Sequence, residues 1–287
     1  MLKQFSAFVV ATGLAVAAHA APVAEYTDLT AFDEAGGSFT ASVNTDDLAD
    51  RWVAVAFSAE AMQEGPSAIS FGGTALTQIA GGPADIGEDG GNAFYTGIWA
   101  GQVSAASGDQ TISVDGTTST ANRTSGGVWL LDGVTGVRDG GYYSYVDNNN
   151  GGNNTGGDAG NFGFNLASEL TREADNAAHD DLTTLAGDLN LFFLGSGANI
   201  GDAWYTTRLD SFIGVSGDAS DVDGNSSSHQ AGHGLSAVDN AELGASLEAG
   251  WYRVGAAGVS FVPVPEPASL ALLGLGGVLL MGRRRRA

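Results

Sequence analysis

The sequence predicts an all-β protein, an antiparallel β-sandwich or jelly roll between two short apolar terminal segments that we expect to be helical. Glycine accounts for 44 of the 287 residues, which favours many tight turns. Threonine, valine and aromatic residues are common between the two ends, whereas lysine, glutamine and glutamate are scarce. Short apolar runs alternate with glycine-containing breaks, and no long stretch has helical periodicity.

The clearest strand signals are two continuous apolar runs and one hairpin. Residues 52–57 (Trp-Val-Ala-Val-Ala-Phe) and residues 189–194 have the length of strands that are buried on both faces. Residues 68–71 and 75–79 lie on either side of Gly72 and Gly73. A strand, two glycines and a second strand predict a β-hairpin with a tight turn.

Further strands are expected at 94–100, 110–114, 127–131 and 251–262. One or two helical turns could form within residues 167–185. Because no helix of any length separates the strands, we expect antiparallel sheets.

Three segments organise the chain: residues 1–20, a body at 21–262 and a terminal segment at 263–287. Within the body, residues 147–161 form a tract rich in asparagine and glycine, which cannot pack a core. The tract is either a long loop or a linker between two domains. Because the second half has fewer clear strands, we favour one domain with a long loop.

The N-terminus has the three parts of a secretory signal peptide. Lys3 supplies the positive start, residues 5–18 are apolar, and Ala18-His19-Ala20 fits the cleavage site of signal peptidase. We expect export by the Sec machinery and cleavage after Ala20.

The C-terminus combines a proline-rich motif, an apolar run and a basic end. Pro265, Glu266 and Pro267 precede the 15 apolar residues 268–282. As a helix this run is about 22 Å long, which is short for a hydrocarbon core of about 30 Å. Flanking arginines can snorkel and so permit a marginal span, with the basic end in the cytoplasm. The arginines are Arg283, Arg284, Arg285 and Arg286.

This order of parts resembles the PEP-CTERM sorting domain of Gram-negative bacteria. The resemblance implies recognition by an exosortase, a membrane cysteine protease-transpeptidase that cuts near the Pro-Glu-Pro motif. Pro265, Glu266 and Pro267 would then be recognition residues. The family is associated with exopolysaccharide and biofilm matrix, so extracellular polysaccharide is a partner that the resemblance suggests.

The body is strongly acidic and lacks cysteine. Between the two terminal segments there are 32 acidic residues against six arginines and no lysine, a net charge of −26. Such a surface repels nucleic acid and anionic lipid, which excludes a nucleic-acid-binding role. The absence of cysteine excludes thiol catalysis, zinc–thiolate sites and iron–sulfur clusters.

Two polar clusters have residue types and spacings that metal sites use. His229 and His233 are four residues apart, but serine and glycine surround them, so we interpret them as exposed loop residues rather than zinc ligands. An acidic turn offers oxygen atoms at spacings that suit Ca²⁺. Its candidate ligands are Asp218, Asp221, Asp223 and Asn225.

Taken together, these features predict a non-enzymatic protein that crosses the inner membrane. Its C-terminal helix would anchor it transiently before it reaches the cell surface or the extracellular matrix. Two alternatives stay open: a secreted hydrolase that acts on polysaccharide through loop carboxylates, and an adhesion module that binds carbohydrate or calcium.

Overall fold

The structure is a computed structural model, and it describes most of the body of the chain. The described residues are 21–29, 33–34, 38–45, 48–60, 62, 64–84, 94–105, 107–116, 122–146, 160–166, 181–197, 209–222, 227–247 and 253–265. Every regular element in these ranges is a strand, so the predicted all-β class is confirmed. Within the same ranges, no helix has the length and apolarity needed to cross a membrane. The two expected terminal helices lie outside the described residues.

The chain divides into two compact units. One comprises Met1–Ala21 together with Val264–Ala287, and the other comprises Pro22–Pro263. The second unit is the body of the protein, and it contains every strand described below.

The body contains one large sheet that curls until it is nearly closed. Its strands are Val23–Leu29 (β1), Asp33–Glu34 (β2), Ser38–Thr45 (β3), Leu48–Glu60 (β4), Ala68–Phe71 (β5), Thr74–Ala84 (β6), Phe94–Ala105 (β7), Gly108–Asp115 (β8) and Asn122–Asp132 (β9). Their order across the sheet is β1-β9-β4-β7-β6-β5-β8-β3-β2, and every pairing is antiparallel. Strand β6 pairs with β5 through residues 74–76 and with β7 through residues 77–84, which lets the sheet fold over.

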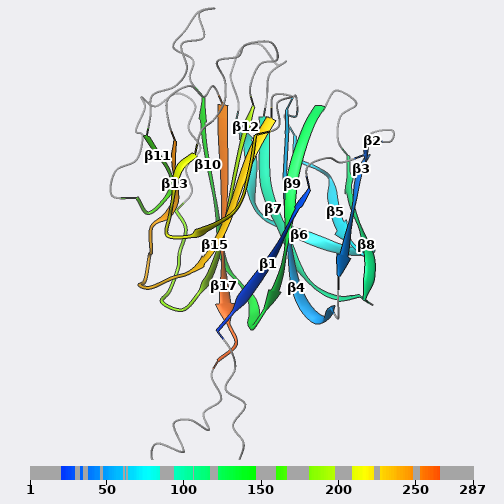
Figure 1. The fold of residues 1–287 in the computed structure, drawn as a ribbon, viewed down its shortest axis with the longest axis horizontal. Coiled ribbons are helices and arrows are strands. Elements are labelled where there is room, and N and C mark those ends of the chain that lie inside the picture. The colour runs from blue at the N-terminus through cyan, green and yellow to red at the C-terminus, as the bar shows by residue number, and fades with distance from the viewer. Residues whose placement is uncertain are drawn as a thin grey trace, which may run out of the picture. The chain divides into compact units, whose positions relative to one another are not determined.

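Two smaller antiparallel sheets complete the body (Figure 1). The strands of the second half are Val134–Val146 (β10), Gly160–Phe164 (β11), Leu189–Gly197 (β12), Leu209–Ile213 (β13), Ser216–Val222 (β14), Ser227–Leu235 (β15), Leu243–Leu247 (β16) and Arg253–Pro263 (β17). One sheet has the order β10-β17-β12-β15-β14, and the other has the order β11-β16-β13.

Three apolar cores separate these layers. The first lies inside the curled sheet and includes Phe57, Phe71 and Trp99. The second lies between the curled sheet and the five-stranded sheet, and the third lies between the five-stranded and three-stranded sheets. The predicted antiparallel class therefore holds, but the body stacks more layers than a simple sandwich.

The continuous apolar runs are strands with a core on each face, as predicted. On β4, Val53 and Val55 point into the first core, whereas Ala54 and Ala56 point into the second. On β12, residues 189, 191 and 193 line the second core, and Phe192 and Leu194 line the third. Because side chains alternate along a strand, an unbroken apolar run is what a strand between two cores requires.

The predicted hairpin is also confirmed. Strands β5 and β6 pair in register from Phe71↔Thr74 onward. The two turn residues, Gly72 and Gly73, have positive φ angles of 56° and 81°. A two-residue turn with both φ angles positive matches the right-handed twist of the flanking strands, and glycine adopts it without steric cost.

Both ends of the body's chain emerge beside the turn between β9 and β10, one next to each strand of that turn. Val23, the first residue of β1, pairs with Asp132 at the end of β9. Pro263, the last residue of β17, pairs with Val134 at the start of β10. Only Gly133, with φ of 71°, separates the two partners. We name this side of the body the exit end, and Figure 1 shows β1 starting and β17 finishing there.

The asparagine- and glycine-rich tract begins on the opposite side. Val146, the last residue of β10, pairs with Arg253, the first residue of β17, and this pair is the farthest from the exit end. Residues 147–159 lie outside the described residues. The prediction of a loop through residue 161 was too long, because Gly160 and Asn161 belong to β11 and pair with β16.

Candidate functional site

The sorting motif follows directly from β17, an interior strand of the five-stranded sheet. Strand β17 pairs with β10 on one side and with β12 on the other, and its residues 254–261 are fully buried or nearly so. The strand ends at Pro263, and Val264 and Pro265 continue the chain. Proline lacks the amide hydrogen that a ladder needs, so the prolines favour an end of the strand at this point. The motif is thus joined to the body without a linker.

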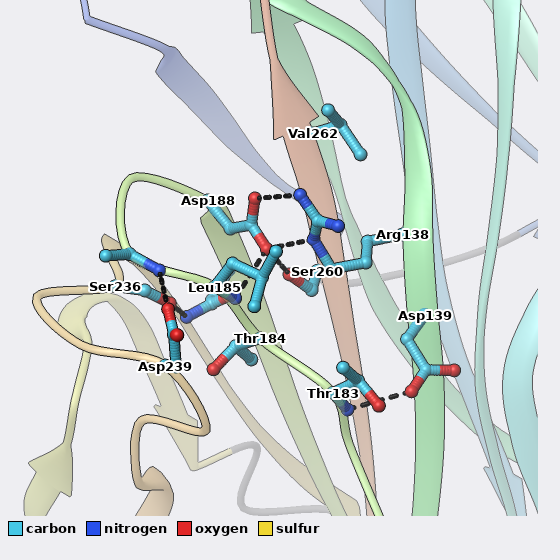
Figure 2. A network of polar contacts seen from close by, with 12 residues as sticks. Arg138, Asp139, Thr183, Thr184, Leu185, Asp188, Ser236, Asp239, Ser260 and Val262 are labelled. Atoms are coloured by element: carbon cyan, nitrogen blue, oxygen red, sulfur yellow. Dashed lines mark hydrogen bonds and ion pairs between the residues drawn. The ribbon is translucent and has the colours of Figure 1, made fainter.

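The buried carboxylate of Asp188 holds the C-terminal end of β17, which we call the stem (Figure 2). Asp188, only 1% exposed, precedes β12, and its Oδ2 accepts a hydrogen bond from the Ser260 hydroxyl of β17 at 3.0 Å. The same oxygen accepts the backbone N–H of Leu185 at 2.8 Å. Arg138 of β10 donates through Nε to Oδ2 and through Nη2 to Oδ1, the latter at 3.0 Å. One carboxylate therefore ties β10, β17 and the segment before β12 together. We call this set of contacts the clamp.

The bidentate geometry explains why an arginine occupies position 138. A guanidinium presents two parallel N–H groups that match the two oxygens of a carboxylate. The hydrogen bond with Asp188 raises the pKa of Arg138 above its ordinary value, so the side chain stays charged at every pH that the cell meets. The bidentate contact therefore keeps a positive charge beside the buried carboxyl group of Asp188.

Two surface segments are fastened around the clamp by backbone and side-chain hydrogen bonds. Residues 181–188 and 236–242 exchange bonds from Gly187 N to Ser236 O, from Ser236 N to Asp188 O, and from Asn240 N to Thr184 O, each 2.8 Å long. We call this pair of segments the exit loops.

Two further carboxylates of the exit end accept backbone amides. Asp139 of β10 accepts the N–H of Thr183 at 2.8 Å, and Asp239 accepts the N–H of Ala186 at 2.9 Å. These carboxylates satisfy amides that no strand pairs, as a turn requires. The acidic groups of the exit end thus order its loops.

The structure reaches only the start of the predicted sorting motif. Pro265 is described, two residues beyond the end of β17. Glu266 and Pro267, the arginines at 283–286, and the signal-cleavage residues Ala18 and Ala20 lie outside the described residues, so their predicted roles stay predictions.

The interpretation of the two histidines as exposed loop residues is wrong. Both lie on β15 and face the curled sheet. His229 is 1% exposed, stacks on Phe193 and contacts Asp28 Oδ1 of β1 through Nε2 at 2.8 Å. The same nitrogen lies 3.3 Å from the Tyr26 hydroxyl. The sequence around His229 is polar on both sides, and it carries no sign of the distant strand that buries it.

The second histidine and Asp218 form a matching contact further along the sheets. His233 Nδ1 lies 2.7 Å from Asp218 Oδ1, and the Trp129 indole N–H donates to Asp218 Oδ2 at 2.9 Å. Strand β14 therefore presents Asp218 to partners from β15 and β9 rather than to solvent. We name these contacts and those of His229 the inter-sheet bridges.

Asp218 was the first of the predicted calcium ligands. Both of its oxygens already accept hydrogen bonds, which leaves it poorly suited to coordinate a cation. Asp221 lies on β14, and Asp223 and Asn225 lie outside the described residues. The described ranges contain no group of three histidine or carboxylate side chains that could hold a metal ion. Calcium binding stays a prediction for the remaining candidates.

After the last strand of the all-β body, the chain continues into a short proline-containing motif, an apolar run and four arginines. Residues 263–286 match the family model of the PEP-CTERM protein-sorting motif, the C-terminal tail of exosortase substrates. No curated protein and no solved structure matches the chain. The tail thus identifies an exported protein with a C-terminal membrane-anchoring sorting signal, and it confirms the expected resemblance.

Proposed function

We propose that the protein is a non-enzymatic component of the cell surface or the extracellular matrix, delivered folded and then released from its anchor. The Sec machinery exports the chain, and signal peptidase removes residues 1–20. The apolar run at 268–282 then holds the chain in the inner membrane with its arginines in the cytoplasm. Exosortase cuts near Pro265-Glu266-Pro267 and frees the body.

The observation that carries this proposal is the direct continuity of a buried central strand with the matched sorting motif. The strands that the structure describes end at Pro263, so a cut near the motif removes none of the described strands or core residues. A processing site at this boundary would separate the sorting signal from the folded body.

The described acidic residues and histidines support a structural role for the body. Asp139, Asp188 and Asp239 hold backbone amides at the exit end, and Asp28 and Asp218 hold the two histidines of the inter-sheet bridges. These five aspartates and two histidines are thus engaged in holding strands and loops together. The body's net charge of −26 would keep it soluble and hydrated within a polysaccharide matrix.

Mass spectrometry of the protein from its own host tests the proposal. We expect an N-terminus at Ala21 and a C-terminus near residue 267, with a tail-retaining form in cells that lack exosortase. A matched pair of variants sharpens the test: Glu266→Ala in the motif should block processing, whereas Glu64→Ala, at an exposed position of the body between β4 and β5, should not. Wild-type protein that keeps both ends in exosortase-containing cells contradicts the proposal.

The matrix role has its own test. Protein released from wild-type cells should co-purify with the host's extracellular polysaccharide, and the Glu266→Ala protein should stay with the inner membrane. A purified body that depolymerises that polysaccharide would favour the hydrolase alternative and overturn the non-enzymatic assignment.

A further inference from the structure

The exposed apolar side chains of the body gather at the exit end. In the described part of the chain, four large apolar residues are exposed: Val23 (49%), Leu185 (38%), Leu235 (45%) and Val238 (60%). The other large apolar side chains whose exposure the structure describes are buried or half-buried. Single exposed apolar residues are ordinary, but their confinement to one end of a protein is not expected by chance.

The pairing registers place these residues around the emerging tail. Val23 begins β1, on the other side of the β9–β10 turn from Pro263. Leu235 pairs with Leu189, which in turn pairs with Phe261, near the end of β17.

The remaining two residues belong to the exit loops. Leu185 donates its backbone N–H to the Asp188 carboxylate, and Val238 lies in the segment that bonds to residues 184–188. The loops that carry Leu185 and Val238 are held by the same carboxylate that clamps the stem, so these apolar side chains are displayed on a fixed scaffold.

Few residues separate the end of β17 from the sorting motif, so a protein that binds the motif lies close to the exit end. An extended chain spans at most about 3.6 Å per residue, so Pro265 lies within about 7 Å of the end of β17 and Pro267 within about 14 Å. A membrane enzyme that closes around residues 265–267 therefore meets the exit end. The strongly negative body disfavours the other nearby partner, an anionic lipid surface.

We propose that Leu185, Leu235 and Val238, with Val23 beside them, form a docking surface for the exosortase that processes this tail. The proposal rests on the proposed function and adds a second recognition element on the folded body. This surface would let the enzyme distinguish a folded body, because the exit loops are fastened to one another and to the Asp188 carboxylate that bonds to β17. An unfolded body presents the same motif without the surface.

A processing assay on the full chain tests the proposal. In host cells that contain exosortase, a variant with Leu185→Ser, Leu235→Ser and Val238→Ser should lose its tail about fivefold to tenfold more slowly than wild type, as expected when anchor residues of an interface are removed. The matched control carries Leu185→Met, Leu235→Met and Val238→Ile, which keep the surface apolar and should keep the wild-type rate. Thermal unfolding of all three proteins checks that the substitutions leave the body folded.

Site-specific photocrosslinking identifies the partner independently of rate. A photoreactive phenylalanine at Val238 should capture an inactive exosortase, identified by its mass, whereas the same group at Thr111, exposed on β8 at the far flank of the curled sheet, should not. Equal processing rates with no exosortase adduct at Val238 overturn the docking surface, and a phospholipid adduct in place of the enzyme overturns it in favour of lipid. Wild-type protein that is never processed refutes the proposed function instead.

Discussion

The first and the last strand of the body leave by the same end but are held in different ways. Strand β17 lies in the middle of its sheet, with β10 and β12 bonded along its two edges and the Asp188 clamp at its tip. Strand β1 is an edge strand of the curled sheet and, among the strands that the structure describes, pairs with β9 alone. Side chains replace the missing second ladder, because Tyr26 and Asp28 reach across to His229.

The difference indicates which of the two strands is harder to detach from its sheet. An edge strand can separate by breaking one ladder, whereas a central strand must break two. The sorting tail continues from β17, which is the harder of the two strands to remove. The strand that follows the predicted signal peptide is secured by fewer bonds and by ionisable side chains.

The largest expected effect comes from removing the clamp on β17. Asp188→Leu should lower the free energy of unfolding by about 3–5 kcal/mol, because it leaves Arg138, the Ser260 hydroxyl and an amide without their acceptor. Hydrogen exchange should accelerate at the end of β17 before it accelerates in β1. Asp239→Leu, on the exposed side of the exit loops, is the control and should cost about 1 kcal/mol or less. A loss for Asp188→Leu as small as that of the control would contradict the clamp.

Two glycines allow the first and last strands to be compared through the same Gly→Ala substitution. One glycine lies on β17, and the other lies on β9, the partner of β1. A Cβ at Gly255 of β17 would lie 2.7 Å from Thr96 Oγ1 and 3.0 Å from Thr96 Cβ, in a packed interior. A Cβ at Gly127 of β9 would meet the ring of Tyr26, whose closest atom lies 2.1 Å away. We expect Gly255→Ala to cost about 1–3 kcal/mol.

Gly127→Ala should cost less, because the partly exposed Tyr26 ring can swing away from β9. Its signature is a change in Trp129 fluorescence, since the two rings lie 5.0 Å apart. Denaturant titrations of both variants measure the two costs. If Gly127→Ala proved the more damaging, β1 would be held more firmly than its single ladder indicates.

The sequence predicted the parts of the fold whose signals are local. Strands β4 and β12 are continuous apolar runs because each has a core on both faces, and the hairpin after Phe71 has the two glycines that its turn requires. The sorting motif could be read for the same reason, since its three parts are contiguous.

Strands β14 and β15 were missed because they are rich in serine, glycine, aspartate and histidine, and pairing through the backbone leaves no local trace. The clamp was missed too. Its members Arg138, Asp188 and Ser260 are separated by 50 and 72 residues, so only the assembled sheets bring them together.

A smaller effect is expected at the inter-sheet bridge that holds β1. His229→Phe keeps a ring on Phe193 but removes the contacts with Asp28 and Tyr26, and it should cost about 1–2 kcal/mol. Exchange at the amides of β1 should quicken while the amides of β17 keep their protection. Equal acceleration in both strands would show that the two ends of the body unfold together rather than separately.

The smallest expected effect concerns Tyr142, on β10 beside the stem. Burial raises the pKa of Tyr142 well above its ordinary value, and its hydroxyl oxygen has no hydrogen-bond partner of good geometry. Below about pH 10 the phenol is neutral in both the folded and the unfolded state. Above that pH the unfolded chain loses the proton while the folded chain keeps it, so stability falls as pH rises.

Tyr142→Phe should therefore change stability at pH 7 by less than about 1 kcal/mol and reduce the loss of stability above pH 10. Tyr26→Phe is the paired test on β1, where the hydroxyl does have a partner in His229, and it should cost about 0.5–1.5 kcal/mol at pH 7. Denaturant titrations at pH 7 and pH 10.5 measure both effects. Tyr142→Phe could instead lower stability at pH 7 more than Tyr26→Phe does. The Tyr142 hydroxyl would then have a stabilising role, and β1 would depend less on the contact between Tyr26 and His229 than the structure indicates.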